Sequence, residues 1–438
     1  MHLTTEFPRL LIALLLCAAY AGLCLMAWRQ SRRAMQTPQL DGAWLVAHAS
    51  QTGTARQLAE VTTKALRAAG LSVSHCELGQ LDPAQLQQVE RALFVVSTQG
   101  EGEAPDQALR FARKHLSQAA SLAHLHYGVL ALGDRSYSRF CGFGQDLDDW
   151  LGRSGAQALF ARIDVNQADP VAIAQWHKEI EALGAAPPAS TLAQPLLPWS
   201  IVERQHLNPG SQGGPVFQIA LHPPAGQNWP HWQAGDLVEI EAPHAAATRL
   251  YSIASLPHEG RLTLLVREQA GGLVSPHLCR DAGPISLRIK SNPVFHLDDQ
   301  ADRPLILIGN GVGLAGLRAH LLARIKAGQT RNWLIFGERQ RAHDAYFHDE
   351  ISHWQNSQSL QYADLCFSRD GGHLRYVQEM LATHGERLLD WVNAGAAIYV
   401  CGSARGMAAD VDAMLAQKLG RARLDDLHNS ARYRRDIF

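Results

Sequence analysis

The spacing of hydrophobic and polar residues divides most of the chain into four stretches. Residues 10–28 are a nearly uncharged apolar run. Residues 41–185 alternate short, fully apolar runs with segments of helical period, which predicts an α/β arrangement around a parallel sheet. Residues 199–300 hold short alternating segments separated by turn residues, which predicts a small antiparallel β-barrel. Residues 301–438 return to apolar strands followed by helices, which predicts a second α/β domain.

The apolar run at residues 10–28 is just long enough to cross a bilayer. A cleaved signal peptide is the alternative, but the run is long for one and offers no clean small-x-small cleavage site. Three arginines follow the run, at positions 29, 32 and 33, and one, Arg9, precedes it. By the positive-inside rule we expect residues 1–40 to anchor the protein in the inner (cytoplasmic) membrane by one transmembrane helix, with its soluble domains facing the cytoplasm.

The overall composition narrows the kinds of partner and site. The 438 residues are enough for two or three domains. The formal net charge is −1, so no overall field favours nucleic acid. The seven cysteines include no C-x-x-C pair, which argues against a zinc site, an iron–sulfur cluster or a disulfide framework and favours a reducing compartment. We therefore predict no metal site.

Three loops follow predicted strands within residues 41–185. The first lies between a strand at 43–47 and a helical pattern at 56–69. It brings three hydroxyls and a glycine to a helix N-terminus, where free N–H groups and the helix dipole favour phosphate, although a Ser/Thr cap on an ordinary helix is common. Without a lysine it suits a monophosphate better than a P-loop ligand. Its residues are Ser50, Gln51, Thr52, Gly53, Thr54 and Ala55.

The second and third loops follow strands at 92–96 and 127–131. Because ligands of open α/β sheets bind beyond the carboxyl ends of strands, we expect the three loops to converge on one flat phosphorylated ligand. The second loop contains Ser97, Thr98, Gln99 and Gly100, and the third contains Leu132, Gly133, Asp134, Tyr137, Phe140 and Gly142.

The three loops together resemble the FMN loops of flavodoxin-like domains, in the form found in cytochrome P450 reductases and sulfite reductase flavoproteins. The matching segments are Ser-Gln-Thr-Gly-Thr-Ala, Ser-Thr-Gln-Gly-Glu-Gly-Glu-Ala-Pro-Asp and Leu-Gly-Asp-Arg-Ser-Tyr. The resemblance implies that residues 50–55 hold the FMN phosphate and that residues 97–102 line one side of the flavin. It also implies that Tyr137 stacks on the flavin and that residues 140–142 complete the third loop.

Residues 186–198 are rich in proline and alanine and uncharged, which predicts a semi-extended hinge before the barrel. Within the barrel, Arg249 and Tyr251 fall on one face of a predicted strand, with Ser252 beside them. The guanidinium can pair bidentately with a pyrophosphate, and the ring can lie against an isoalloxazine. The hydroxyl can reach the flavin edge where hydride arrives. An exposed strand with an ordinary arginine is the alternative.

A Gly-Gly pair at 271–272 precedes a short helical stretch and permits close approach to a diphosphate, although a simple turn explains it equally well. This loop and the arginine strand are similar to the FAD-binding segments of the ferredoxin–NADP reductase family. P450 reductases insert a long helical region before the arginine strand, where this chain has only residues 244–248. We therefore expect the hinge to do more of the positioning. The resemblance assigns to FAD the residues Arg249, Leu250, Tyr251, Ser252, Gly271, Gly272, Val274 and Ser275.

The third domain, residues 301–438, begins with an apolar strand and a glycine-rich turn at 309–316 that opens a helix. This arrangement is what a pyrophosphate requires, and it makes Gly311 and Gly313 candidate nucleotide-binding residues. The family usually shows Gly-Pro-Gly-Thr-Gly-Ile-Ala-Pro here. This chain departs from that pattern at Asn310, Val312 and Gly316, and Val312 removes a hydroxyl.

A second nucleotide-binding pattern follows the strand that ends near residue 367. A serine and an arginine at a strand end can clamp a ribose 2′-phosphate and adenine, although a solvated polar turn is the alternative. The family pattern Ser-Arg-…-Lys-x-Tyr-x-Gln favours NADPH over NADH, and its lysine is Leu374 here with an arginine beside it. The residues assigned to this clamp are Ser368, Arg369, Arg375, Tyr376 and Gln378.

The catalytic residues come from the resemblance. The segment 399–402 is similar to the family's Tyr-Val-Cys-Gly, whose thiol lies beside the nicotinamide, although Cys401 also fits as a small residue ending a buried strand. Asp410, in the following helix, is assigned to the nucleotide site. The family's last aromatic covers the flavin until nicotinamide displaces it, which implies this role for Phe438. Asp436 is then expected to support hydride transfer with Ser252 and Cys401.

The resemblance covers about residues 43–438 and implies a membrane-anchored, NADPH-dependent diflavin oxidoreductase with FMN, FAD and NADPH as cofactors. Electrons are expected to pass from NADPH to FAD, to FMN and then to a protein, haem or iron acceptor. One alternative is the flavoprotein component of a sulfite reductase, and another is a non-catalytic flavin-binding scaffold, which Val312 suggests. The expected partners are the membrane and an electron-acceptor protein, such as a haem- or iron-reducing membrane protein, and not nucleic acid.

Overall fold

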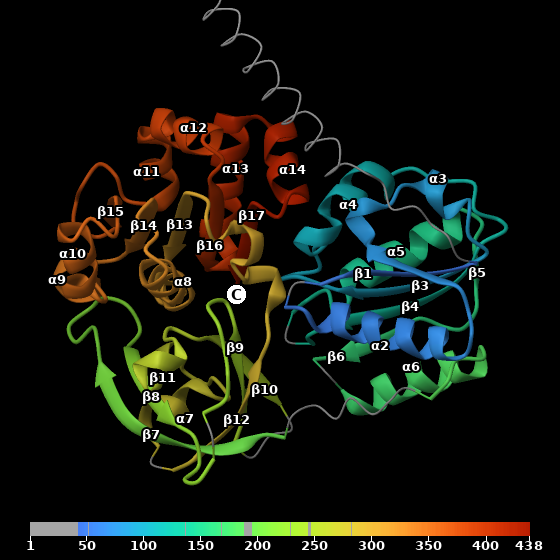
Figure 1. Cartoon of the computed structure of the whole chain (residues 1–438), viewed down its shortest axis with the longest axis horizontal. Coiled ribbons are helices and arrows are strands. Elements are labelled where there is room, and N and C mark those ends of the chain that lie inside the picture. The colour runs from blue at the N-terminus through green and yellow to red at the C-terminus, as the bar shows by residue number, and fades with distance from the viewer. Residues whose placement is uncertain are drawn as a thin grey trace, which may run out of the picture. The chain divides into compact units, whose positions relative to one another are not determined.

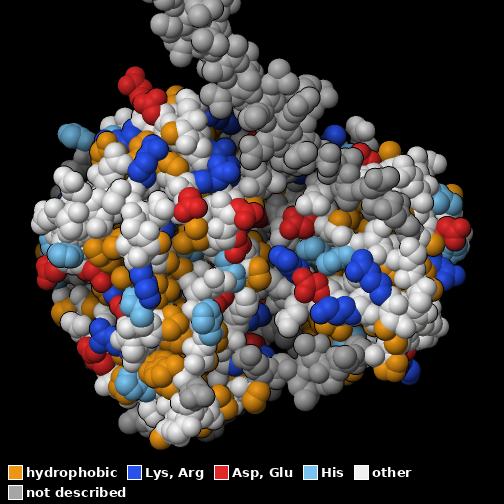
Figure 2. Space-filling view, viewed as in Figure 1, with side chains coloured by type: hydrophobic (Ala, Val, Ile, Leu, Met, Phe, Trp, Pro, Cys, Tyr) orange, Lys and Arg blue, Asp and Glu red, His pale blue; other side chains and the backbone are white. Residues whose placement is uncertain are grey.

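The computed structural model describes residues 43–438, except 51, 136, 168, 188–194, 228, 244–246 and 282. The described residues form three sheets, all within the compact unit Leu40–Phe438 (Figure 1). Two of these sheets are parallel and one is antiparallel. On the face shown in Figure 2, acidic and basic side chains are intermixed among neutral ones. The two parallel sheets fall within residues 41–185 and 301–438, and the antiparallel sheet spans residues 197–290, so it begins in the predicted hinge.

The first sheet is parallel, with the strand order β2-β1-β3-β4-β5, and β6 also pairs with β4. This is the order of the flavodoxin-like doubly wound fold. Its strands are β1 (Trp44–Ala49), β2 (Val73–Glu77), β3 (Arg91–Ser97), β4 (His126–Gly133), β5 (Gln157–Ala158) and β6 (Ile163–Asn166). Its helices are α2 (Thr54–Ala68), α3 (Pro83–Leu86), α4 (Leu109–His115), α5 (Gly142–Arg153) and α6 (Pro170–Ala182).

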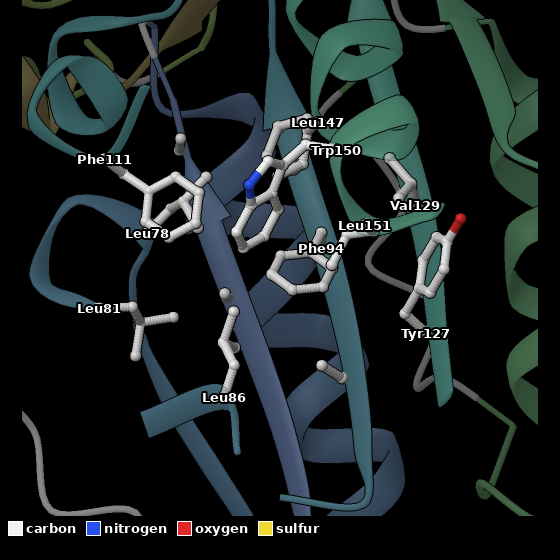
Figure 3. Close-up of a cluster of buried hydrophobic side chains, with 14 of the residues drawn as sticks. Leu78, Leu81, Leu86, Phe94, Phe111, Tyr127, Val129, Leu147, Trp150 and Leu151 are labelled. Carbon is white, nitrogen blue, oxygen red and sulfur yellow. The ribbon is translucent and has the colours of Figure 1, made fainter. Parts of the chain in front are cut away.

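Both faces of this sheet are covered, which explains why its central strands are almost continuously apolar. On one face, Phe94 of β3 packs with Phe111 of α4 and Trp150 of α5 (Figure 3). The rings of Phe111 and Trp150 meet edge to face at 5.3 Å between centroids. On the other face, Leu93 and Trp176 belong to a second buried cluster that α2 and α6 complete. Burial on both faces holds the strand ends, and the loops that follow them, in fixed positions.

The second sheet is antiparallel, with the order β10-β9-β12-β7-β8-β11. An additional bridge between Ile253 and Leu264 joins the residue after β10 to β11, so the sheet curls back on itself as a barrel. The alternating pattern predicts strands at 200–204, 216–221, 235–241, 249–255 and 261–267, which correspond to five of these strands, and it misses β12. The strands are β7 (Leu197–His206), β8 (Val216–His222), β9 (Leu237–Glu241), β10 (Thr248–Ser252), β11 (Leu262–Arg267) and β12 (Ile285–Lys290), and the helix α7 spans Ser275–Arg280.

The third sheet is parallel, with the order β15-β14-β13-β16-β17. Buried clusters cover both of its faces. Its strands are β13 (Leu305–Asn310), β14 (Asn332–Glu338), β15 (Tyr362–Phe367), β16 (Ala397–Gly402) and β17 (Tyr433–Ile437). Its helices are α8 (Leu314–Lys326), α9 (Arg341–Asp344), α10 (His348–Asn356), α11 (Val377–Thr383), α12 (Gly385–Asn393), α13 (Ala409–Leu419) and α14 (Arg421–Asn429).

Two local features differ from the pattern-based expectation. The C-terminal segment, rich in charge, is an edge strand because β17 pairs in parallel with β16 along its length. The end of the predicted hinge at 186–198 belongs to the barrel, since Leu197 pairs with Leu287. Trp199, just beyond the hinge, is buried in the barrel core. Strand pairing, which the local sequence does not reveal, therefore extends both elements.

The predicted single-pass location in the inner membrane is corrected. No helix in the described part of the chain combines the length and the apolar character needed to cross a bilayer. The segment on which the prediction rested, residues 10–28, lies outside the described residues. We therefore assign no anchor and no location to the protein.

Candidate functional site

A cleft of about 960 Å³ is lined by the barrel and by the third domain. This volume is at the upper end of the range for small-molecule sites, roughly 300–1,000 Å³. Fifteen of the predicted residues line it, from two separate sheets. They are Arg249, Leu250, Tyr251, Ser252, Gly272, Val274, Ser275, Gly311, Ser368, Arg369, Arg375, Tyr376, Gln378, Asp410 and Phe438.

Three predicted catalytic side chains meet beside this cleft, each from a different strand. Ser252 Oγ donates a hydrogen bond of 2.7 Å to Asp436 Oδ2, and Cys401 Sγ lies 3.7 Å from the same oxygen. Burial, together with the neighbouring carboxylate, raises the pKa of Cys401 well above its usual value, so the thiol stays protonated. Burial also raises the pKa of Asp436, against the opposing effect of the two hydrogen bonds. The cluster is therefore a proton-holding group rather than a reactive thiolate.

The C-terminal residue presents its ring to the cleft. Phe438 is 53% exposed. Its backbone is held on both sides, because Phe438 N donates to Gly402 O at 3.0 Å and Ala404 N donates to Phe438 O at 2.9 Å. A fixed backbone with an exposed ring suits a side chain that stacks on a flat ligand and can turn aside without unfolding the tail.

The glycine-rich turn serves both the cleft and the packing beneath it. Gly311 lines the cleft with a φ of 57°, a conformation that favours glycine. Gly313 does not line the cleft. A Cβ on Gly313 would lie 2.2 Å from the carbonyl oxygen of Cys401, so this glycine lets the start of α8 approach β16. Gly316 similarly leaves room for the Cys401 thiol, which would lie 3.3 Å from an added Cβ.

The predicted 2′-phosphate residues stand together at the cleft rim. Arg369 and Arg375 are exposed, as is Tyr376. Gln378 Nε2 donates to Asp410 Oδ2 at 3.1 Å, which links α11 to α13. Two exposed guanidinium groups and an exposed aromatic ring at the end of a parallel strand suit a phosphorylated nucleoside.

The three predicted FMN loops meet at one edge of the first sheet. Ser97 Oγ donates to Ala49 O at 3.3 Å, next to the first loop, and Thr98 N donates to Leu132 O at 2.8 Å, at the third. A Cβ on Gly142 would lie 2.9 Å from the Cα of Gly102, so the second and third loops touch through glycines. The structure thus brings together loops that lie up to about ninety residues apart in the sequence.

The first of these loops has the features of a phosphate cradle. Gly53, with a φ of 82°, is the residue that caps α2 at its N-terminus. The hydroxyl of Ser50 accepts from Ala55 N at 3.2 Å, and the hydroxyls of Thr52 and Thr54 lie 3.5 Å apart. Gln51 lies outside the described residues. In the third loop, Asp134 Oδ2 accepts from Gln167 Nε2, and the Arg135 guanidinium lies over the ring of Phe140.

Comparison with known proteins agrees with this geometry. Residues 46–178 match the family described as Flavodoxin. The chain is 26% identical to the sulfite reductase [NADPH] flavoprotein alpha-component of Shewanella sp. (strain MR-7), with 90% of this chain and 89% of that protein covered. It is 27% identical to the protein of the same name from Neisseria meningitidis serogroup C (strain 053442), with 90% and 89% covered. For that of Bacillus subtilis (strain 168) the identity is 26%, with 92% and 90% covered.

The flavodoxin match and the relatives that cover 90% of the chain are consistent with a diflavin reductase family. The protein is a flavoprotein oxidoreductase, and it is shorter than its relatives inside the shared region. The Shewanella alignment spans 538 positions but uses 90% of a 438-residue chain, so about 140 positions of the relative have no counterpart here. In this reductase β9 and β10 form a direct hairpin, closed by a bond of 2.8 Å from Ala242 N to Ala247 O. The direct hairpin agrees with the missing connecting region that the sequence indicated.

Sequence reasoning missed three charged residues that line the cleft of the reductase. Arg267 of β11 forms a close ion pair with the buried Glu338 of β14, and Glu338 Oε2 also accepts from Arg339 N at 2.8 Å. The Nη1 atoms of both arginines are buried without a hydrogen-bond partner. Arg267 ends an apolar strand and Arg339 directly follows one. This position at a strand end is the sequence signal that could have identified both arginines as site residues. Because Glu338 contacts both arginine residues, it offsets part of their charge, and the net positive charge at the cleft stays small.

The residues present fit the cofactors of a diflavin reductase. In the first domain, the Thr98 hydroxyl of the second loop is buried without a partner, and Tyr137 of the third loop is 39% exposed. These features suit a flat, polar-edged ring with a phosphate at the α2 N-terminus. At the cleft, unsatisfied arginine donors and the exposed ring of Phe438 suit a dinucleotide and a nicotinamide nucleotide.

Proposed function

We propose that this diflavin reductase oxidises NADPH and acts as the flavoprotein component of a sulfite reductase-type system. The meeting of Ser252, Cys401 and Asp436 beside an exposed Phe438 is the observation that carries the proposal. The names of the relatives support a protein acceptor, because each relative is named as the alpha-component of a sulfite reductase. The acceptor is accordingly a separate protein rather than a small molecule.

The cofactors of the reductase are FMN, FAD and NADPH. When bound, they supply hydride transfer from nicotinamide and the passage of electrons one at a time. In the cleft, Arg249 would pair with the FAD pyrophosphate, and Ser368 and Arg369 would bind the ribose 2′-phosphate. In the first domain, Ser50, Thr52 and Thr54 would hold the FMN phosphate at the start of α2.

The residues at the reacting edge hold rather than exchange protons. Ser252 Oγ carries a proton that points at Asp436, and the protonated Cys401 thiol points at the same oxygen. This fixed pair of donors leaves the lone pair of the Ser252 oxygen free to orient an incoming ring edge. The ring of Phe438 would cover the flavin and keep water from it until nicotinamide binds.

The proposal is tested by reconstitution. Purified reductase is mixed with the partner component of a sulfite reductase, and NADPH oxidation is followed at increasing sulfite. A sulfite-dependent rate that requires both proteins is expected. If the protein reduced cytochrome c with NADPH but showed no sulfite-dependent rate, the proposed acceptor would be wrong. The proposal that the protein oxidises NADPH would still stand.

The second candidate is a non-catalytic flavin-binding scaffold. Val312 favours it, because this residue lines the cleft where the family has a hydroxyl. The same purified protein separates the two candidates. If it contained FMN and FAD in equal amounts but oxidised no NADPH in the presence of cytochrome c or ferricyanide, the scaffold would be the better description.

A further inference from the structure

An ion pair joins the first domain to the tail strand of the third. Arg435 Nε donates to Asp106 Oδ2 at 2.8 Å, and Arg435 Nη2 contacts the other carboxylate oxygen. The two side chains are only 9% and 8% exposed. Asp106 is the last residue of the segment 97–106 that resembles an FMN loop, four positions after the residues expected to line the flavin, and Arg435 lies in β17, one residue before Asp436. The pair is therefore close in sequence to both proposed redox sites.

Further contacts surround this pair on the same two surfaces. Arg113 of α4 lies 3.6 Å from Asp425 of α14. A Cβ on Gly53, in the phosphate loop, would lie 3.2 Å from Pro293 of the barrel. Arg434, next to Arg435, donates to the carbonyl of Pro293 at 3.1 Å, so the tail strand and this segment form one surface. The Asp106–Arg435 pair lies within a wider contact rather than at an isolated point.

The chemistry of the pair favours a precise orientation. A bidentate arginine–carboxylate contact is planar and directional, unlike a lysine contact. Burial alone would raise the pKa of Asp106, but the Arg435 guanidinium outweighs burial and holds that pKa below its usual value. Both groups are thus charged when the contact is made. A buried ion pair adds little net stability but strongly penalises the loss of one partner, so it selects one arrangement over others.

Adjacent side chains on a strand point to opposite sides. On β17, Arg435 faces Asp106 of the first domain, whereas Asp436 faces Ser252 and Cys401. One strand therefore contacts the proposed FMN domain on one side and the hydride site on the other. The short β9–β10 hairpin supplies no connecting region that could hold the first domain instead.

We propose that the Asp106–Arg435 pair docks the FMN-binding domain on the tail strand and positions it to receive electrons from the FAD module. The pair is a direct link between the two modules in a chain that lacks about 140 positions of its Shewanella relative. This inference rests on the proposed function. Asp106 and Arg435 are positioning residues, because neither belongs to the proposed cofactor contacts.

The test compares Asp106→Asn and Asp106→Glu with the wild-type chain, loaded with both flavins. Glu203→Gln is the matched control, since Glu203 forms an exposed ion pair with Arg261 inside the barrel. Two rates are measured: the first reduction of FAD by NADPH, by stopped flow, and the turnover of cytochrome c. In the full reaction, one NADPH and two ferric cytochromes c yield NADP⁺, two ferrous cytochromes c and one proton.

For Asp106→Asn we expect FAD reduction to stay within about twofold of wild type, and cytochrome c turnover to fall about 10-fold or more, because removal of one partner strands a buried charge. Asp106→Glu should recover most of the turnover, and Glu203→Gln should match wild type in both rates. Unchanged turnover in Asp106→Asn would overturn the proposal. An equal fall in both rates would overturn it too, because the effect would then lie in hydride transfer.

A structural readout separates this inference from the proposed function. Small-angle X-ray scattering of the full chain should give a larger radius of gyration for Asp106→Asn than for wild type and Glu203→Gln at low salt. Identical scattering for all chains would overturn the docking role. Wild-type protein that failed to reduce FAD with NADPH would instead sink the proposed function, whatever the scattering showed.

Discussion

Ser252 and Asp436 share a hydrogen bond of 2.7 Å although 184 residues separate them in the chain. The serine ends a barrel strand, and the aspartate lies in the last strand of the third domain. Their contact therefore exists only when the barrel and the third domain are packed together. The proposed hydride site is accordingly a property of the domain interface, and its residues can be tested one at a time.

Ser252→Ala should slow the reduction of FAD by NADPH. Loss of a hydrogen bond to a charged group costs about 1.5–3 kcal/mol, or about 10- to 150-fold in rate if it acts only in the transition state. Stopped-flow absorbance at the flavin band measures this step. Ser200→Ala, at an exposed position of β7, is the control and should match wild type. Equal rates for Ser252→Ala and the control would exclude a role for this hydroxyl.

Arg369→Ala should raise the KM for NADPH far more than the KM for NADH. Its guanidinium stands exposed at the cleft rim, where we place the ribose 2′-phosphate that NADH lacks. The lost charged hydrogen bond corresponds to about 1.5–3 kcal/mol. Steady-state cytochrome c reduction with each nucleotide gives both constants, with the exposed Arg110→Ala of α4 as control. A similar rise for both nucleotides would remove the assignment.

Deletion of Phe438 should improve the use of NADH relative to NADPH. The exposed ring must be displaced before nicotinamide can stack, and NADH has less binding energy available for this because it makes no 2′-phosphate contact. The ratio of kcat/KM values for the two nucleotides measures the effect. Phe438→Trp should keep or strengthen the wild-type preference. If the deletion left the ratio unchanged, Phe438 would not cover the flavin.

Gly313→Ala should destabilise the third domain. The added Cβ would lie 2.2 Å from the carbonyl oxygen of Cys401, a backbone atom that cannot move without shifting β16. Overpacking of this kind costs about 1–3 kcal/mol or more. Thermal denaturation followed by circular dichroism measures it. Gly372→Ala, with open space around its Cβ, is the control, and equal melting temperatures for the two variants would show that α8 can retreat.

The apparent melting temperature should fall as the pH is lowered from about 6.5 toward 3, in part through His320. Burial, followed by the charges of His296 and Arg434, lowers the pKa of His320 from 6.5 to about 3. Between these two values the unfolded chain binds a proton that the folded chain excludes, so stability is present above pH 6.5 and is lost below it. His320→Gln should show a shallower decline between pH 6.5 and 5. Parallel curves would indicate that His320 titrates normally in the fold.

Much of the local structure could be predicted from the sequence. Apolar runs placed β1, β3 and β4 of the first sheet and β13 of the third, and the hydroxyl and glycine loops after them marked the proposed phosphate sites, because strand burial and turn chemistry depend on neighbouring residues. Arg249, Tyr251 and Ser252 were found in the same way, and all three line the cleft.

The sequence by itself thus determined which segments carry chemistry, and the tertiary structure decided which of them meet. The strand character of residues 433–437 depends on pairing with β16, and the barrel closes through a bridge between Ile253 and Leu264. The Arg267–Glu338 and Arg435–Asp106 pairs join residues 71 and 329 positions apart. Such partners are set by sheet order and register, which arise from the packing of the whole chain and leave no local mark in the sequence.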